Sequence, residues 1–197
     1  MSADRSPELA EIVRGCAWLA GVLATVREAG LPDAWTGAGV LRDLVWGSRY
    51  GSGFRPAFRP AEVRDVDVAF FDPDDLSRAR DLAATDLLRS GRPDIPWEAT
   101  NQAAVHTWYH ETFRTDPVAP LTSTADGVAT WPETATSVGV RLGVDGGVEV
   151  CAPHGLDDLL DGIWRRNPRR VSVESSRARL ARHDPARRWP GVRVIAP

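Results

Sequence analysis

The fold is indicated most clearly by the stretch VRDVDVAFF, residues 63–71. Its β-branched and aromatic residues predict a strand, and the side chains of a strand point alternately to its two faces. Asp65 and Asp67 therefore share one face, and the apolar residues that alternate with them share the other. We expect the apolar face to be buried and the two carboxylates to converge above the opposite face.

The two carboxylates have the spacing of metal ligands. Residues two apart on one strand face lie about 6.5 to 7 Å apart, from where they can converge on one or two divalent cations. Oxygen ligands favour Mg²⁺ or Mn²⁺. Asp65 and Asp67 are therefore the candidate metal ligands and candidate catalytic residues. The alternative is an ordinary pair of acids at a strand edge.

A glycine-bearing turn lies upstream, in WTGAGVLRDLVWG at residues 35–47. The pattern predicts a short strand, a turn and then a helix. Glycine lets the backbone approach a phosphate closely, and a helix N-terminus offers unpaired N–H donors. Gly37, Gly39 and Arg42 are therefore the candidate nucleotide-binding residues. The alternatives are a tight turn for the two glycines and an ion pair with Asp43 for the arginine.

The decapeptide AGVLRDLVWG, residues 38–47, resembles the Gly-Gly-x-Val-Arg-Asp-x-Leu-Leu-Gly signature of the polymerase-β-like nucleotidyltransferases, notably the head domain of CCA-adding enzymes. In that superfamily, too, an Asp-x-Asp strand follows. Short segments across residues 35–189 are similar to a small stand-alone bacterial nucleotidyltransferase-like family of unassigned substrate. Ala38 stands in place of the first glycine, Leu41 in place of the valine, and the connection between the two motifs is longer than usual.

The resemblance implies an α+β fold, with a small mixed sheet flanked by helices. It also implies a third carboxylate from a neighbouring strand. Glu98 is the acid on the strand expected at residues 97–100, and it is our candidate for that third catalytic residue. Because the register of this strand is weakly specified, Glu98 as a plain surface acid stays open.

The activity implied by the resemblance is metal-dependent transfer of a nucleoside monophosphate from a nucleoside triphosphate to an acceptor, with release of pyrophosphate. The acceptor is expected to be a small molecule or a protein side chain rather than a tRNA, because little chain remains for the helical body with which CCA-adding enzymes hold tRNA. Two alternatives stay open. One is a non-catalytic nucleotide-binding or interaction module of the same fold, and the other is a glycosyltransferase.

Composition excludes several other classes. The 197 residues predict a single domain, residues 1–197, with an arginine-rich C-terminal segment. All 24 basic residues are arginines, which excludes Schiff-base chemistry, pyridoxal-lysine chemistry and the P-loop lysine. Cys16 and Cys151 are too few for a disulfide framework, so a cytoplasmic location is expected. The apolar run at residues 16–26 is too short to span a bilayer, and no membrane partner is expected.

The charge of the chain is uneven. The net charge is −3, yet residues 165–193 hold ten arginines against two acids. We expect this segment either to face phosphates or to pair with the acidic body.

The sequence pattern predicts four further helices, over residues 8–29, from residue 73, from residue 102 with Asn101 as cap, and over residues 156–164. It also predicts a hairpin around Asp145-Gly146 and a last strand at residues 192–195. Residues 48–61 are expected to form a loop, whose arginines are candidates for a lid.

Overall fold

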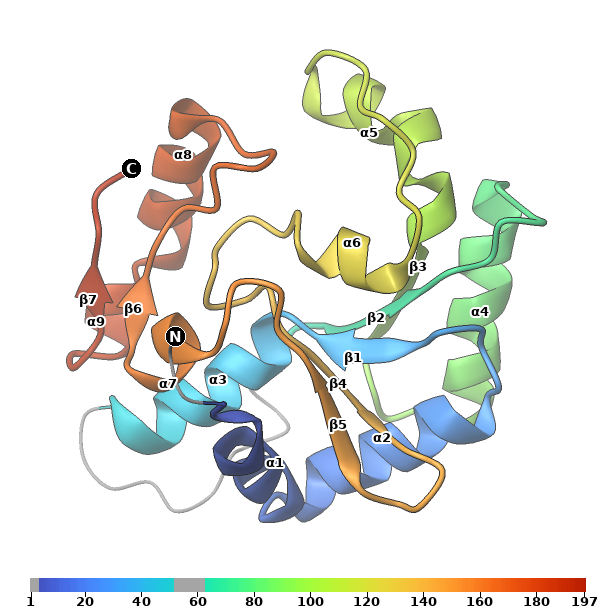
Figure 1. Cartoon of the computed structure of the whole chain (residues 1–197), viewed down its shortest axis with the longest axis horizontal. Helices are drawn as coiled ribbons and strands as arrows, with labels where there is room; N and C mark the ends of the chain where they lie inside the picture. Colours follow the sequence, from blue (N-terminus) through green and yellow to red (C-terminus); the bar gives the residue numbers. More distant parts are fainter. Residues whose placement is uncertain (1–3, 52–62) are drawn as a thin grey trace.

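The computed structural model describes residues 4–51 and 63–197, and it has the mixed α+β architecture that the sequence predicts (Figure 1). The strands are β1 (Trp35–Gly37), β2 (Val66–Phe70), β3 (Trp97–Asn101), β4 (Gly139–Leu142), β5 (Val148–Cys151), β6 (Ile163–Trp164) and β7 (Arg193–Val194). The helices are α1 (Ser6–Arg14), α2 (Ala17–Glu28), α3 (Gly39–Arg49), α4 (Arg78–Gly91), the 3₁₀ turn η2 (Gln102–Ala104), α5 (Val105–Phe113), α6 (Thr124–Val128), α7 (Asp157–Leu160), α8 (Val173–His183) and α9 (Pro185–Arg188).

Five strands form one mixed sheet in the order β3-β2-β1-β4-β5, and β6 pairs with β7 in a separate ribbon. Strands β2 and β3 are parallel, whereas the other neighbours in the five-stranded sheet are antiparallel. In this register Asp67 of β2 lies beside Gly37 of β1 on one side and beside Glu98 of β3 on the other. The sheet therefore brings the predicted acids of two strands to the same level.

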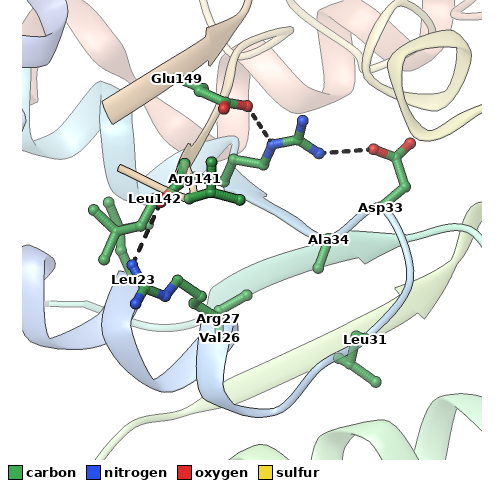
Figure 2. Close-up of a pocket in the computed structure, with 11 residues that line it drawn as sticks. Leu23, Val26, Arg27, Leu31, Asp33, Ala34, Arg141, Leu142 and Glu149 are labelled. Carbon is green, nitrogen blue, oxygen red and sulfur yellow. Dashed lines mark hydrogen bonds and ion pairs between the residues drawn. The ribbon is translucent and has the colours of Figure 1, made fainter. Parts of the chain in front are cut away.

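The predicted hairpin is confirmed as β4 and β5, and it bounds a small pocket with α2 (Figure 2). This pocket has a volume of about 230 Å³. Arg141 lies across it, with its guanidinium 3.0 Å from a carboxylate oxygen of Asp33 and 2.7 Å from one of Glu149. These charged groups are already paired with one another, and the pocket is not the candidate site.

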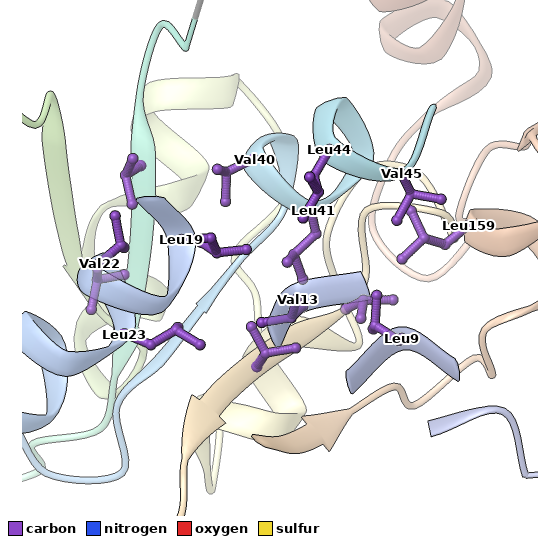
Figure 3. Close-up of a cluster of buried hydrophobic side chains, with 14 of the residues drawn as sticks. Leu9, Val13, Leu19, Val22, Leu23, Val40, Leu41, Leu44, Val45 and Leu159 are labelled. Atoms are coloured by element: carbon purple, nitrogen blue, oxygen red, sulfur yellow. The ribbon is translucent and has the colours of Figure 1, made fainter. Parts of the chain in front are cut away.

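The core packs the apolar sides of α1, α2 and α3 together (Figure 3). Leu9 and Val13 of α1, Leu23 of α2 and Leu41 of α3 are almost completely excluded from solvent. The apolar face of β2 closes on the same cluster, because Val66, Val68 and Phe70 are at most 1% exposed. The alternation predicted for residues 63–71 is thereby confirmed, although the strand itself is shorter.

The single helix predicted over residues 8–29 is wrong. Cys16 adopts an extended conformation, with φ −104° and ψ 94°, and it separates α1 from α2. The two helices meet at 101°, so both can lay their apolar sides on the core. In the described part of the chain no single helix is long and apolar enough to cross a membrane, and only the bent pair of α1 and α2 passes that test together.

The helix predicted from Pro73 begins later, at Arg78, and its predicted buried side is also wrong. Asn101 accounts for the late start, because its side-chain N–H groups donate to the backbone carbonyls of Asp72 and Asp75, and its Oδ1 accepts the N–H of Asp72. These bonds hold residues 72–75 as a turn. Helical spacing in the sequence predicts a buried side made of Leu76, Ala79, Ala83 and Leu87, whereas α4 buries Asp81, Ala84 and Leu88.

After α4, the structure agrees with the predicted elements in part. The predicted cap of the helix from Gln102 is confirmed, because the side chain of Asn101 accepts the N–H of Ala103. The helix expected over residues 156–164 is only α7, since Gly162 adopts φ 66° and the chain then enters β6. The predicted last strand is β7, and α8 was not predicted. The loop expected at residues 48–61 lies mainly outside the described residues.

Candidate active site

A cleft of about 560 Å³ opens on the polar side of β2, between α5 and α8. All three predicted acids line it, namely Asp65, Asp67 and Glu98. Asp65 immediately precedes β2, and the parallel register of β2 and β3 sets Glu98 beside Asp67. The structure therefore brings the three predicted acids together in one cleft.

The electrostatics of Asp67 show that these acids repel one another. Burial at the cleft floor is the largest cause that raises the pKa of Asp67, to about 7, and the charges of Asp65 and Glu98 raise it further. Arg42 and Arg179 act in the opposite direction. Throughout residues 4–51 and 63–197, no hydrogen bond or ion pair engages these three carboxylates. The cleft floor thus gathers three acids without direct partners, whose mutual repulsion Arg42 and Arg179 offset only in part.

This donor set suits Mg²⁺ or Mn²⁺ bound together with a phosphate. In the described residues no group of three His, Cys, Asp or Glu side chains is close enough to hold an ion unaided. Mg²⁺ in proteins usually takes only one or two carboxylates and completes its shell with water and substrate phosphates. The neighbouring Asp65 and Asp67 fit that requirement, and a cation would relieve the repulsion that raises the pKa of Asp67.

The two glycines of the turn have different roles. Gly39 begins α3 and lines the cleft, where a Cβ on it would lie 3.9 Å from Oδ1 of Asp65. Gly37 is buried inside the sheet and does not line the cleft. A Cβ on Gly37 would lie 2.4 Å from the carbonyl oxygen of Val138 and 2.8 Å from the ring of Trp131. Close packing therefore explains Gly37 within β1, whereas Gly39 faces the ligand space.

Ala38, between the two glycines, lines the cleft in a conformation that suits glycine. Its φ of 56° and ψ of −122° correspond to the second residue of a type II′ turn, a position that glycine dominates. Because alanine carries a Cβ, this positive φ leaves Ala38 under local strain.

Arg42 makes the local ion pair that was its alternative interpretation, and it also lines the cleft. Its Nε and Nη2 donate to Oδ1 of Asp43 at 2.9 and 2.6 Å. The guanidinium lies 5.2 Å from the ring centroid of Trp189, and the residue is only 5% exposed. Asp43 also accepts a hydrogen bond from Arg188, at 2.8 Å. Arg42 is thus held rigidly at the edge of the site.

Helix α8 forms a cationic wall opposite the acids. Arg179 donates to both carboxylate oxygens of Glu133, at 2.7 and 3.0 Å, and Glu133 is fully buried. Arg182 and Arg64 also line the cleft and have no carboxylate partner in the described part of the chain. The arginine-rich segment therefore pairs with an acid of the body, which is one of the two expected alternatives. It also lines the cleft, and its contact with phosphates stays a prediction.

His183 lies at the centre of this wall. Burial, followed by the charges of Arg42 and Arg179, lowers its pKa to about 3, so the imidazole is neutral at pH 7. We did not single out His183 or Arg182 from the sequence. The available signal was their spacing from Arg179, since residues three and four apart share one face of a helix.

His106 follows Gln102 by four residues, so the sequence allows either a substrate contact or an ordinary helix histidine. In the structure His106 does not line the cleft, and its Nδ1 lies 3.0 Å from the carbonyl oxygen of Ala103, within its own turn.

Three tryptophans of predicted helices are expected in the core. Trp46 and Trp164 are fully buried, whereas Trp18 packs against the core only in part. The sequence offers Glu133 and Thr134 as a helix-capping pair, whereas in the structure Glu133 forms the buried ion pair described above.

Comparisons with known proteins identify the family and the fold of the chain. The model of a nucleotidyltransferase family matches residues 24–194. A solved structure described as a CCA-adding enzyme head domain matches with a TM-score of 0.78 at 28% identity, covering 100% of this chain and 98% of that one. A comparison with curated proteins found no match.

Two larger enzymes share the fold. The CCA-adding enzyme of Thermotoga maritima complexed with tRNA matches with a TM-score of 0.56 at 13% identity, covering 99% of this chain and 43% of that one. A CCA-adding enzyme complexed with ATP matches with a TM-score of 0.54 at 13% identity, covering 99% and 44%. The chain thus spans less than half the length of these enzymes.

Proposed function

This chain belongs to the nucleotidyltransferase family, and we propose that it transfers a nucleoside monophosphate from a nucleoside triphosphate to an acceptor hydroxyl, with a divalent cation as cofactor. The observation that carries the proposal is the half-buried carboxylate of Asp67, repelled by two neighbouring acids and facing the arginines of α8 across one cleft.

Asp65 and Asp67 would hold Mg²⁺ or Mn²⁺ at the floor of the cleft. When bound, the cation supplies positive charge to the phosphoryl oxygens on which negative charge develops. Gly39 and the N-terminus of α3 would bind phosphate oxygens, because that end of the helix offers unpaired N–H groups and the positive end of its dipole. Arg182 on the opposite wall, and Arg64 next to Asp65, would bind the leaving pyrophosphate.

Glu98 would serve as the general base. It lies beside Asp67 in the sheet and lines the same cleft, so a hydroxyl seated there can pass its proton to the carboxylate. The acceptor oxygen then bonds to the α-phosphorus, the bond from that phosphorus to the bridging oxygen breaks, and pyrophosphate leaves. His183, neutral at pH 7, adds no charge to the wall and can donate or accept a hydrogen bond there.

We propose a small molecule or a protein side chain, rather than a tRNA, as the acceptor. The cleft that would hold the nucleotide and the acceptor together has a volume of about 560 Å³. Helix α8 closes one side of the cleft from within this chain, and Arg179 and Arg182 of α8 form part of its wall.

The test measures pyrophosphate release with each nucleoside triphosphate and Mg²⁺, alongside equilibrium binding of the same nucleotides. We expect release by the unmodified protein and a loss of about 100-fold or more in Asp67→Asn and in Glu98→Gln. Asp116→Asn is the matched control, because Asp116 is exposed and lies outside the cleft. Mg²⁺-dependent binding without release would favour the alternative, a non-catalytic nucleotide-binding module. The absence of both binding and release would refute the proposal.

A further inference from the structure

The α5 side of the cleft is lined by three aromatic rings. Tyr109 and Phe113 lie with ring centroids 4.6 Å apart, and Trp108 lies 6.3 and 6.5 Å from them. All three line the cleft, and Phe113 is 57% exposed. Exposed aromatic faces gathered in a cleft are a surface on which a planar ring can stack.

An arginine without a carboxylate partner lies over one of these rings. The guanidinium carbon of Arg170 is 5.0 Å from the ring centroid of Tyr109, and the residue lines the cleft. Arg170 is half-buried, and across the described residues no carboxylate pairs with it. Burial lowers the pKa of Arg170, because a desolvated guanidinium loses its hydration without gaining an anion. An anionic group on a ligand would supply the missing charge.

The same end of the cleft holds an unused donor. The indole N–H of Trp108 is buried and has no hydrogen-bond partner among the described groups. A buried donor without a partner destabilises a fold by about 1 to 3 kcal/mol, so such groups usually meet a ligand, a water or another polar group. The stacking surface and the cation therefore lie on one side of the cleft, and the residue that carries the unpaired donor lines the same side.

We propose that this side of the cleft binds the acceptor, and that the acceptor is a planar aromatic compound carrying an anionic group such as a phosphate. The inference rests on the proposed function, since it names the second substrate of that site. The base of the donor nucleotide is the other candidate for the rings, but a neutral base leaves Arg170 without a counter-charge. Arg179 acts on both Tyr109 and Asp67, which sets the rings and the acids within reach of one arginine.

Phenyl phosphate is a suitable probe, because it has the ring and the anion and lacks the features of a nucleotide. Its binding is measured calorimetrically with and without a saturating non-hydrolysable nucleoside triphosphate and Mg²⁺, and compared with inorganic phosphate. We expect phenyl phosphate to bind about tenfold or more tightly than phosphate, in both conditions, because the ring adds stacking to the charge. Arg170→Gln should weaken phenyl phosphate by about tenfold or more and leave the triphosphate unchanged.

Arg187→Gln is the matched control, because Arg187 is 89% exposed and lies outside the cleft. It should leave the binding of both ligands unchanged. Equal affinity for phenyl phosphate and phosphate, or an unchanged affinity in Arg170→Gln, would overturn the inference. Weakened triphosphate binding in Arg170→Gln would assign the rings to the donor base and overturn it as well. Failure of the proposed function would appear separately, as triphosphate binding that does not depend on Asp67.

Discussion

Replacement of Asp67 by asparagine removes a carboxylate that the folded chain holds in its charged form only at a large expense of free energy. The side chain keeps its shape, and its new amide can donate to the neighbouring carboxylates of Asp65 and Glu98. The effect of the change on stability should therefore depend strongly on pH.

The direction of this pH dependence follows from the raised pKa of Asp67. Burial and the two neighbouring acids raise the pKa of Asp67 from 3.8 to about 7, so the folded state binds this proton about a thousandfold more tightly than the unfolded chain. Stability from this residue is fully present below pH 4 and is lost as the pH rises through 7. At about 1.4 kcal/mol for each factor of ten, the loss is at most about 4 kcal/mol, and less to the extent that solvent reaches the carboxylate.

The assay is urea denaturation of the metal-free protein at intervals between pH 4.5 and 8. Groups away from the cleft titrate alike in both proteins, so the difference between Asp67→Asn and the unmodified protein reports the carboxylate of Asp67 and its repulsion by Asp65 and Glu98. We expect a small difference at pH 4.5 and a variant that is more stable by about 2 to 4 kcal/mol at pH 8. Asp116→Asn should follow the unmodified protein throughout. A difference that stays constant with pH would refute the account of the cleft floor.

Three other substitutions test the packing around the cleft. Gly37→Ala should destabilise by about 3 kcal/mol or more, because the new Cβ meets the carbonyl oxygen of Val138 at 2.4 Å; an unchanged melting temperature with weakened nucleotide binding would instead indicate a phosphate contact. Ala38→Gly should stabilise by about 1 kcal/mol in urea denaturation, since it relieves a positive φ, and a destabilised variant would contradict this. Glu133→Gln should lower the free energy of unfolding by about 2 kcal/mol, because Arg179 loses its buried counter-charge, and unchanged stability would show that the ion pair contributes nothing.

The site residues that could be predicted are those whose arrangement is local. Alternation along one strand put Asp65 and Asp67 together, and a neighbouring parallel strand set Glu98 beside them. The start of α4 and its buried side depended instead on Asn101, which comes 29 residues after Asp72 and holds the turn there. Local pattern alone cannot give such a contact.

The cationic wall of the cleft could not be predicted from the sequence for the same reason. Arg179 and Glu133 are 46 residues apart, and the ion pair between them is a tertiary contact. A run of arginines indicated only a positive segment, while the helical periodicity that sets Arg179, Arg182 and His183 on one face was weak in a segment with few apolar residues. The aromatic side of α5 was not predicted, because nothing in the sequence pattern distinguishes its three aromatic residues from other residues of a helix.

Binding of Mn²⁺ in the presence of a non-hydrolysable nucleoside triphosphate, followed by electron paramagnetic resonance, tests the central claim most directly. The unmodified protein should bind Mn²⁺ and nucleotide together, and Asp65→Asn with Asp67→Asn should weaken that binding by about tenfold or more while the fold persists. If the doubly substituted protein binds Mn²⁺ and nucleotide as tightly as the unmodified one, the two aspartates do not form the metal site.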